Sequence, residues 1–239
     1  MQTVLDTLRL CPKALLLEGE AYEEMRASAN PLVKGLILIV VVGVLISLVG
    51  IVGETLEWAT TPSFDEMQEI VWQGMEEMPW VQQIPLEERR AVMEIIRQRY
   101  DFGWRIARLF APNPLNAALK VIAIPILLLI GWFIYSLLAH LFAKLLGGQA
   151  SFGQTFGCTA LAVSPQLLNL ANLLPYVKVG VVVWAWMLVC NYLALKIAHR
   201  FDTGRAFWAA ILPLIVLALL AAALVAIGVA IASALIGGR

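Results

Sequence analysis

Residues 147–213 read GGQASFGQTFGCTALAVSPQLLNLANLLPYVKVGVVVWAWMLVCNYLALKIAHRFDTGRAFWAAILP, and this stretch decides the fold. A turn with two glycines and a serine leads into an apolar segment that Pro165 interrupts. A second apolar segment ends in basic residues between Lys196 and Arg205, and a third begins after them. Long apolar segments joined by short polar turns are typical of a membrane protein that crosses the bilayer several times.

The whole chain has the same character. Of its 239 residues, 61% are hydrophobic and 14% are charged, whereas soluble domains carry about 25% charged residues. Because a bilayer core needs about 20 apolar residues per helix, the long runs without charge predict an all-α membrane protein with a bundle of five transmembrane helices. The predicted spans are Gly35–Gly53, Val121–Ala143, Phe152–Leu174, Val179–Leu195 and Ile211–Ser233. A soluble protein with buried helices is disfavoured, because its apolar runs are usually about 10–14 residues long.

Two regions are predicted to lie outside the spans. Residues 1–30 contain an acidic stretch, Glu18–Glu24, and lack the compact apolar core of a signal peptide. We predict an N-terminal surface segment there, either a short amphipathic helix at the membrane face or a loosely ordered tail. Residues 31–239 then form the transmembrane domain, with 54–117 as an inserted helical region between the first two spans.

The inserted region is predicted to contain two amphipathic helices. Ser63 and Glu66 match a capping box at the start of the first helix. The second helix, over about 85–110, has apolar residues along one side and several arginines elsewhere. Such a helix suits an anionic lipid surface and a protein partner about equally well.

Basic residues indicate the orientation. With five spans, the N-terminus and the turns at 144–152 and 196–205 share one side, which holds many of the lysines and arginines near the membrane. The rule that positive charges stay inside therefore favours a cytoplasmic N-terminus and an external C-terminus, with the bacterial inner membrane as the expected location.

Polar side chains within the predicted spans are the candidate intramembrane contacts. Thr155, Thr159, Gln166 and Asn169 fall on one arc of the third span, where Pro165 is expected to kink the helix, and Asn191 lies in the fourth. Side-chain amides are costly against lipid, so this arc should face the bundle interior. It would either join helices through hydrogen bonds or line a groove for a ligand or permeant. No Asp or Glu lies in a predicted span, which weakens an ion-coupled transport function.

The fifth span carries a ridge of small residues, and the chain lacks enzyme signatures. Small residues at four-residue spacing let helix backbones approach closely, within one chain or between copies. The three cysteines are widely separated, and no metalloprotease, P-loop or dinucleotide-binding motif is present. We therefore expect no enzyme activity, catalytic residue, cofactor or metal, and with a net charge of zero no nucleic-acid partner. The ridge consists of Ala218, Ala222, Ala226, Ala230 and Ala234.

The order of these features resembles the Yip1 domain family. The resemblance lies in the glycine turn, the S-F-x-Q helix start, a proline within the helix, and a basic turn before the last span, and it is best over about 140–215. The inserted helical region and the absence of a long N-terminal domain depart from the eukaryotic members and suggest a bacterial type. The positions that carry the resemblance are Gly147, Gly148, Ser151, Phe152, Gln154, Pro165, Pro175, Trp184, Lys196, His199 and Ala206.

The resemblance implies a five-helix integral membrane protein with a cytoplasmic N-terminus. It favours a non-enzymatic membrane scaffold or protein-interaction partner, in contact with the lipid bilayer and with a protein partner or a second copy. Two alternatives stay open: an accessory subunit of a larger membrane complex, and a small-solute transporter or channel lined by the polar face of the third span.

Overall fold

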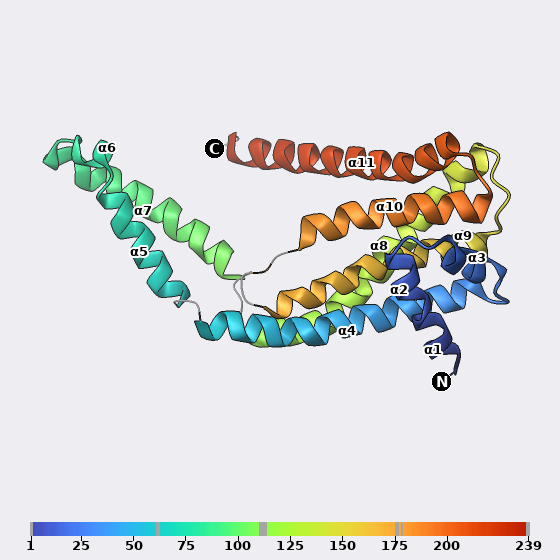
Figure 1. Cartoon of the computed structure of the whole chain (residues 1–239). Helices are drawn as coiled ribbons and strands as arrows, with labels where there is room; N and C mark the ends of the chain where they lie inside the picture. Colours follow the sequence, from blue (N-terminus) through green and yellow to red (C-terminus); the bar gives the residue numbers. More distant parts are fainter. Residues whose placement is uncertain (1, 61–62, 110–113, 175–176, 178, 238–239) are drawn as a thin grey trace.

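The structure is a computed structural model that describes residues 2–60, 63–109, 114–174, 177 and 179–237. Long helices lie side by side in a bundle, short N-terminal helices pack at one end of it, and a helical hairpin projects from the other end (Figure 1). The elements are α1 (Gln2–Leu8), α2 (Leu10–Leu15), α3 (Gly19–Ala27), α4 (Pro31–Thr60), α5 (Phe64–Glu76), α6 (Pro79–Gln82), α7 (Leu86–Leu109), α8 (Pro114–Leu145), α9 (Phe152–Leu161), the 3₁₀ helix η1 (Ser164–Leu173), α10 (Gly180–His199) and α11 (Thr203–Gly237).

Four helices in the described part of the chain are long and apolar enough to cross a membrane. Their candidate spans are Pro31–Gly53, Leu119–Leu145, Gly180–His199 and Thr203–Ala230, which correspond to four of the five predicted spans. The predicted third span, Phe152–Leu174, is divided instead between α9 and η1. Pro165 lies in the first turn of η1, and its missing N–H and its ring disfavour an α-helix at this point. Proline alone does not end a helix here, because α8 continues through Pro125 and α11 continues through Pro213. The total of five spans therefore stays a prediction.

Glycine turns and caps set the ends of the helices around this division. Gly147 has a φ of +87° and ends α8, where the Gly148 N–H donates to the Ala143 carbonyl at 2.8 Å. Ser151 begins α9 with a capping box, because its hydroxyl accepts from the Gln154 N–H while the Gln154 side chain accepts from the Ser151 N–H. The turn between α8 and α9 is therefore closed by local hydrogen bonds.

Small residues bring α4 close to its neighbours. A Cβ added at Gly157 of α9 would lie 2.8 Å from the Pro31 carbonyl oxygen, and one at Gly43 of α4 would lie 2.9 Å from the Pro125 Cα. Real Cβ atoms essentially never approach other atoms that closely. Helix α4 therefore packs backbone against backbone with α9 and α8, as small residues allow in membrane bundles.

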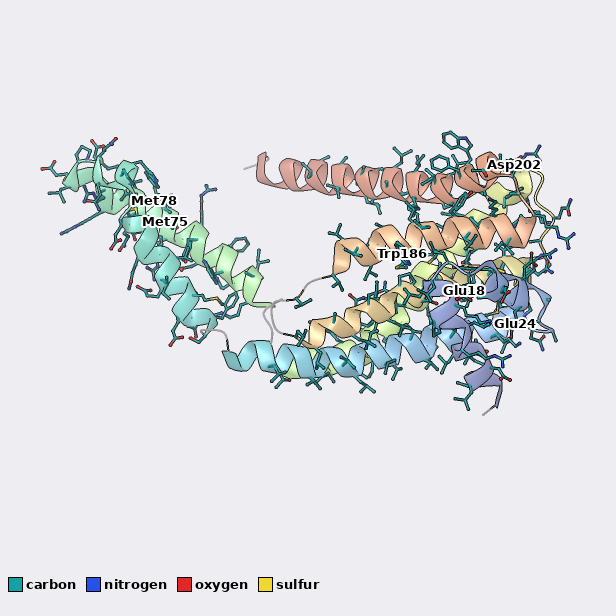
Figure 2. All side chains as sticks on the ribbon, viewed as in Figure 1. Glu18, Glu24, Met75, Met78, Trp186 and Asp202 are labelled. Atoms are coloured by element: carbon teal, nitrogen blue, oxygen red, sulfur yellow. The ribbon has the colours of Figure 1, made fainter. Side chains whose placement is uncertain are left out.

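The N-terminal segment packs more deeply than the predicted surface segment or tail. Ala14 of α2 and Tyr22 and Met25 of α3 are fully buried in the core that α4, α9 and α10 share. The Trp186 indole also donates to the Leu15 carbonyl at 2.7 Å, and the Arg26 Nε donates to the Ala198 carbonyl at 3.1 Å. The acidic side chains that suggested a surface location, such as Glu18 and Glu24, lie on the exposed side of the same helices (Figure 2).

The inserted region forms a hairpin of α5, α6 and α7. Its first helix begins at the predicted capping box, since the Ser63 hydroxyl accepts from the Glu66 N–H and the Glu66 carboxylate accepts from the Ser63 N–H. Met75 and Met78 lie at the tip of the hairpin, at the opposite end of the molecule from Asp202 (Figure 2). The hairpin and the turn between α10 and α11 therefore mark the two ends of the bundle.

Candidate functional site

A seam of polar side chains, buried except for the half-buried His140, joins α8, α9 and α10. The Thr155 hydroxyl lies between two imidazoles, 2.8 Å from His140 Nδ1 and 2.9 Å from His199 Nε2. One helical turn farther along, the Ser136 and Thr159 hydroxyls lie 2.7 Å apart. The seam therefore links three elements through uncharged side chains at helix-turn spacing.

The hydrogen bonds of the seam determine where its protons lie. The Ala150 backbone N–H donates to His199 Nδ1 at 3.4 Å, so Nδ1 is an acceptor and the proton of the neutral ring is on Nε2. His199 Nε2–H then donates to the Thr155 hydroxyl, which donates in turn to His140 Nδ1. The Ser151 carbonyl, 3.2 Å from the same hydroxyl, is the alternative acceptor.

The hydrogen bonds of the seam join neighbouring helices of the bundle. Thr155 is fully buried, and the nearby cavity is lined by Thr159 but does not include Thr155 among its lining residues. Among the residues that the structure describes, no three His, Cys, Asp or Glu side chains cluster to hold a metal ion. These hydrogen bonds satisfy polar groups that would otherwise be costly inside a bundle.

The predicted polar arc is divided in two by the helix break. Thr155 and Thr159 join the seam, whereas Gln166 and Asn169 lie on η1. The Asn169 amide donates to Gln166 Oε1 at 2.6 Å, and the Gln166 amide donates to the Met187 sulfur at 3.1 Å. Asn191 donates to the Met187 carbonyl of its own helix at 3.0 Å. The four residues of the predicted arc therefore do not form one continuous face.

The sequence did not identify His140, Ser136 or the contact role of His199. A pattern was available, because Ser136 and His140 are four residues apart, as are Thr155 and Thr159. Residues four apart lie on the same face of a helix, so a polar pair on one helix can form hydrogen bonds with a polar pair on its neighbour. The pairing itself was not predictable, because it depends on the register between α8 and α9.

The positions of the resemblance have different roles. Gly147, Gly148, Ser151 and Gln154 form the turn and the cap of α9, and Gln154 also donates to the Arg26 carbonyl at 3.4 Å. Phe152 stacks on Phe156 with ring centroids 4.1 Å apart. Of the remaining positions, Pro165 and Ala206 are buried, and Trp184 is exposed. Lys196 is half-buried, with its ammonium over the Tyr192 ring. Pro175 lies outside the described residues.

A cavity of about 380 Å³ lies next to the seam. Its walls come from α8, α9, η1, α10 and α11, and its lining is almost entirely apolar. It is lined by Ile124, Leu127, Leu128, Gly131, Trp132 and Tyr135 of α8, by Thr159, Ala162, Val163 and Gln166, by Trp184, Met187, Leu188 and Asn191 of α10, and by Leu214 and Leu217 of α11.

The alanine ridge of α11 is exposed along the part of it whose side chains the structure describes. Ala218, Ala222, Ala226 and Ala230 are all exposed, and the side chain of Ala234 lies outside the described residues. Helix α11 packs against α8 and α10, and its buried residues, such as Ala206 and Ala210, lie in its first turns. The ridge therefore faces the surroundings of the bundle, where lipid or a second copy would contact it.

The apolar spans, the short polar turns and the buried uncharged seam define an integral membrane protein of the helical-bundle class. The family model for the Yip1 domain matches residues 13–225, which is most of the chain, and the chain belongs to the Yip1 domain family. The match begins within α2, so part of the N-terminal segment belongs to the family domain. No curated protein and no solved structure matches the chain.

Proposed function

We propose that this Yip1 domain protein is a non-enzymatic membrane scaffold that binds a protein partner through the α5–α7 hairpin. The observation that carries the proposal is an apolar stripe on α7. Val92, Ile95, Phe102 and Ile106 recur along one side of the helix, and each is at least 36% exposed. Apolar surface of this kind on an extramembrane element is typical of an interaction site.

The contacts inside the hairpin support this proposal, because they occupy the opposite side of α7. Tyr100 donates to the Gln68 carbonyl, Arg108 pairs with Asp65, and the Arg97 guanidinium lies over the Trp72 ring, 4.5 Å from its centroid. At 100° per residue, Arg97, Tyr100 and Arg108 point away from the stripe. The polar and aromatic contacts therefore hold α5 and α7 together and leave the apolar stripe exposed. The one ring contact of the stripe in the described hairpin is that of Phe102, whose centroid lies 6.0 Å from the Arg105 guanidinium carbon of the same helix.

The direction of the hairpin favours a protein partner over a lipid surface. The hairpin rises obliquely from the end of the bundle, and its tip is the part farthest from the long helices (Figure 1). A helix that rests on a bilayer would lie across the bundle axis, with its apolar face toward the lipid. Arg99 also lies within the stripe, which suits an acidic group on a partner.

We also propose that α9 and η1 together form a fifth crossing of the membrane. Each has 10 residues, so at about 1.5 and 2.0 Å per residue they extend roughly 35 Å, enough for a core of about 30 Å. Figure 1 shows η1 running back toward the hairpin end of the bundle. With five crossings, the basic turns favour a cytoplasmic N-terminus and an external C-terminus, and the location that we propose is the bacterial inner membrane.

The test is photo-cross-linking from the hairpin in native membranes. Benzoylphenylalanine replaces Ile95 in the stripe, or Leu86, which is 77% exposed on the same helix but lies off the stripe. We expect a discrete protein adduct from position 95 and none from position 86. Adducts with lipid alone, or equal protein adducts from both positions, would exclude a partner site on the stripe.

The alternatives predict different results. An accessory subunit would co-purify with its complex in fixed stoichiometry, whereas a scaffold would exchange partners. A solute pathway along the polar arc is supported only by Gln166 and Thr159, which both line the cavity. If it exists, Gln166→Leu with Asn169→Leu should abolish flux in a folded protein, and unchanged flux would eliminate this function.

A further inference from the structure

We propose that the cavity between α8, η1, α10 and α11 binds a neutral membrane lipid whose head group is a hydroxyl. This inference is independent of the scaffold function, which requires no ligand. The cavity volume of about 380 Å³ lies within the range of roughly 300–1,000 Å³ that small-molecule sites occupy. Its lining, mostly apolar with a few polar groups, is also that of a ligand site.

The polar groups indicate a hydroxyl. Asn191 Oδ1 is buried and has no hydrogen-bond partner in the described structure. The hydrogen bond of the Asn191 side chain is made by Nδ2, which donates to the Met187 carbonyl. Gln166 Nε2 donates to the Met187 sulfur, a weak acceptor, and has a second N–H. Both amides bind Met187, Gln166 at the side-chain sulfur and Asn191 at the backbone carbonyl, and both line the cavity. A hydroxyl between them can donate to Asn191 Oδ1 and accept from Gln166, which would satisfy a group that is costly when unpaired.

The lining also indicates a ligand without charge. No lining residue that the structure describes is Asp, Glu, Lys or Arg. A carboxylate or phosphate in this cavity would lose its hydration without gaining an opposite charge, which is strongly unfavourable. A neutral head group has no such cost, and a hydrocarbon chain matches the leucine, isoleucine and tryptophan side chains around it.

The cavity is accessible from the side of the bundle. Trp184 of α10 is 70% exposed and Leu127 of α8 is 65% exposed, although both line the cavity. Each residue lies within a candidate span, so its exposed surface faces the hydrocarbon of the bilayer. A lipid can therefore enter from the membrane without passing through water.

Photolabelling in phosphatidylcholine vesicles tests the proposal with three probes that share a mid-chain diazirine: 1-hexadecanol, hexadecane and palmitate. With the wild-type protein, we expect hexadecanol to label peptides from the cavity walls of α8 and α10, and unlabelled hexadecanol to compete. Hexadecane should label these peptides roughly fivefold less, because it lacks a hydrogen bond worth about that factor. Equal labelling by all three probes, or labelling spread along the exposed half of α11, would overturn the proposal.

Two variants locate the site. Gly131 lines the cavity, and a Cβ there meets no atom within 4 Å, so Gly131→Phe introduces a large side chain at the cavity wall with no clash at its first atom. We expect it to reduce hexadecanol labelling at least fivefold. Gly228→Phe, at an equally open position of α11 outside the cavity, is the matched control and should leave labelling unchanged. Undiminished labelling of a folded Gly131→Phe protein would contradict the site.

Asn191→Leu distinguishes the contribution of the hydroxyl head group to labelling from that of the hydrocarbon chain. It should lower hexadecanol labelling to the level of hexadecane and leave hexadecane labelling unchanged, because the acceptor oxygen for the hydroxyl is lost. The Nδ2 donor that the change also removes binds the Met187 carbonyl of the same helix and not the ligand. If hexadecanol still labels the variant better than hexadecane does, the head group does not bind at Asn191. The comparison of probes on the wild-type protein requires no variant, so the proposal stays testable even if a variant fails to fold.

Discussion

At the scale of single residues, the hydroxyl of Thr155 is the central atom of the buried seam. Replacing Thr155 with Val keeps the shape and removes the group that lies between the two imidazoles. We expect a loss of about 1–3 kcal/mol in the free energy of unfolding, because buried ring nitrogens lose their partner. The measurement is the thermal unfolding midpoint in mild detergent. Thr55→Val is the control, since the exposed Thr55 hydroxyl donates only to the Ile51 carbonyl of its own helix; equal effects of the two changes would contradict a structural seam.

Gly157 tests the close contact of α9 with α4 at the same scale. In Gly157→Ala, the new methyl group would meet the Pro31 carbonyl carbon and oxygen, which belong to the backbone and cannot rotate away. We expect destabilisation of about 1–3 kcal/mol from overpacking. Gly228→Ala, where nothing lies within 4 Å, should be neutral or slightly stabilising. The two variants can be compared by thermal unfolding, and a Gly157→Ala midpoint at or above the wild-type value would show that α4 and α9 separate easily.

Sequence reasoning at this scale was only partly successful. It selected Thr155 and Thr159 because polar side chains are rare in spans, and both are buried in hydrogen bonds. It assumed a single helical arc, which fails at Pro165, where η1 follows a different geometry from α9. It did not select His140, because the partner of His140 on α9 is unknown until the helices are packed.

At the scale of elements, the two capping boxes stabilise different parts of the molecule. Ser151→Ala removes the cap of α9, which is buried in the bundle, and should lower the unfolding midpoint of the whole domain, with a cost of about 1 kcal/mol. Ser63→Ala removes the cap of α5 in the projecting hairpin. It should leave the bundle midpoint unchanged and speed limited proteolysis within residues 63–109. If Ser63→Ala both lowers the bundle midpoint and speeds proteolysis of residues 63–109, the hairpin and the bundle unfold as one unit.

Most of the helical elements could be predicted from the sequence, because long uncharged runs and capping boxes are local patterns. The depth of α2 and α3 could not be predicted, because Ala14 and Tyr22 read as ordinary residues of an amphipathic segment. Their burial depends on the space between α9 and α10, which exists only in the folded bundle. The acidic residues on the exposed side of the same helices indicated a surface segment instead.

At the scale of the whole molecule, buried cysteines make the orientation measurable. Cys11, Cys158 and Cys190 are buried, and burial raises the pKa of the Cys11 thiol. A higher pKa leaves less thiolate at neutral pH, and the thiolate is the reactive form. We expect almost no maleimide labelling of the folded wild-type protein and full labelling after unfolding in detergent. Fast labelling of the native protein at pH 7 would mean that the N-terminal helices open.

Because the native cysteines should not be labelled in the folded protein, single added cysteines can test the five crossings. Ile70, Gln149 and Leu174 are exposed, and they lie in the hairpin, in the turn before α9 and directly after η1. If α9 and η1 cross the membrane together, an impermeant maleimide added to intact cells should label Ile70→Cys and Leu174→Cys but should not label Gln149→Cys until the cells are permeabilised. If the segment instead folds back within one leaflet, Leu174→Cys and Gln149→Cys should be labelled from the same side. Labelling of Gln149→Cys alone in intact cells would reverse the orientation and place the hairpin, with its apolar stripe, in the cytoplasm.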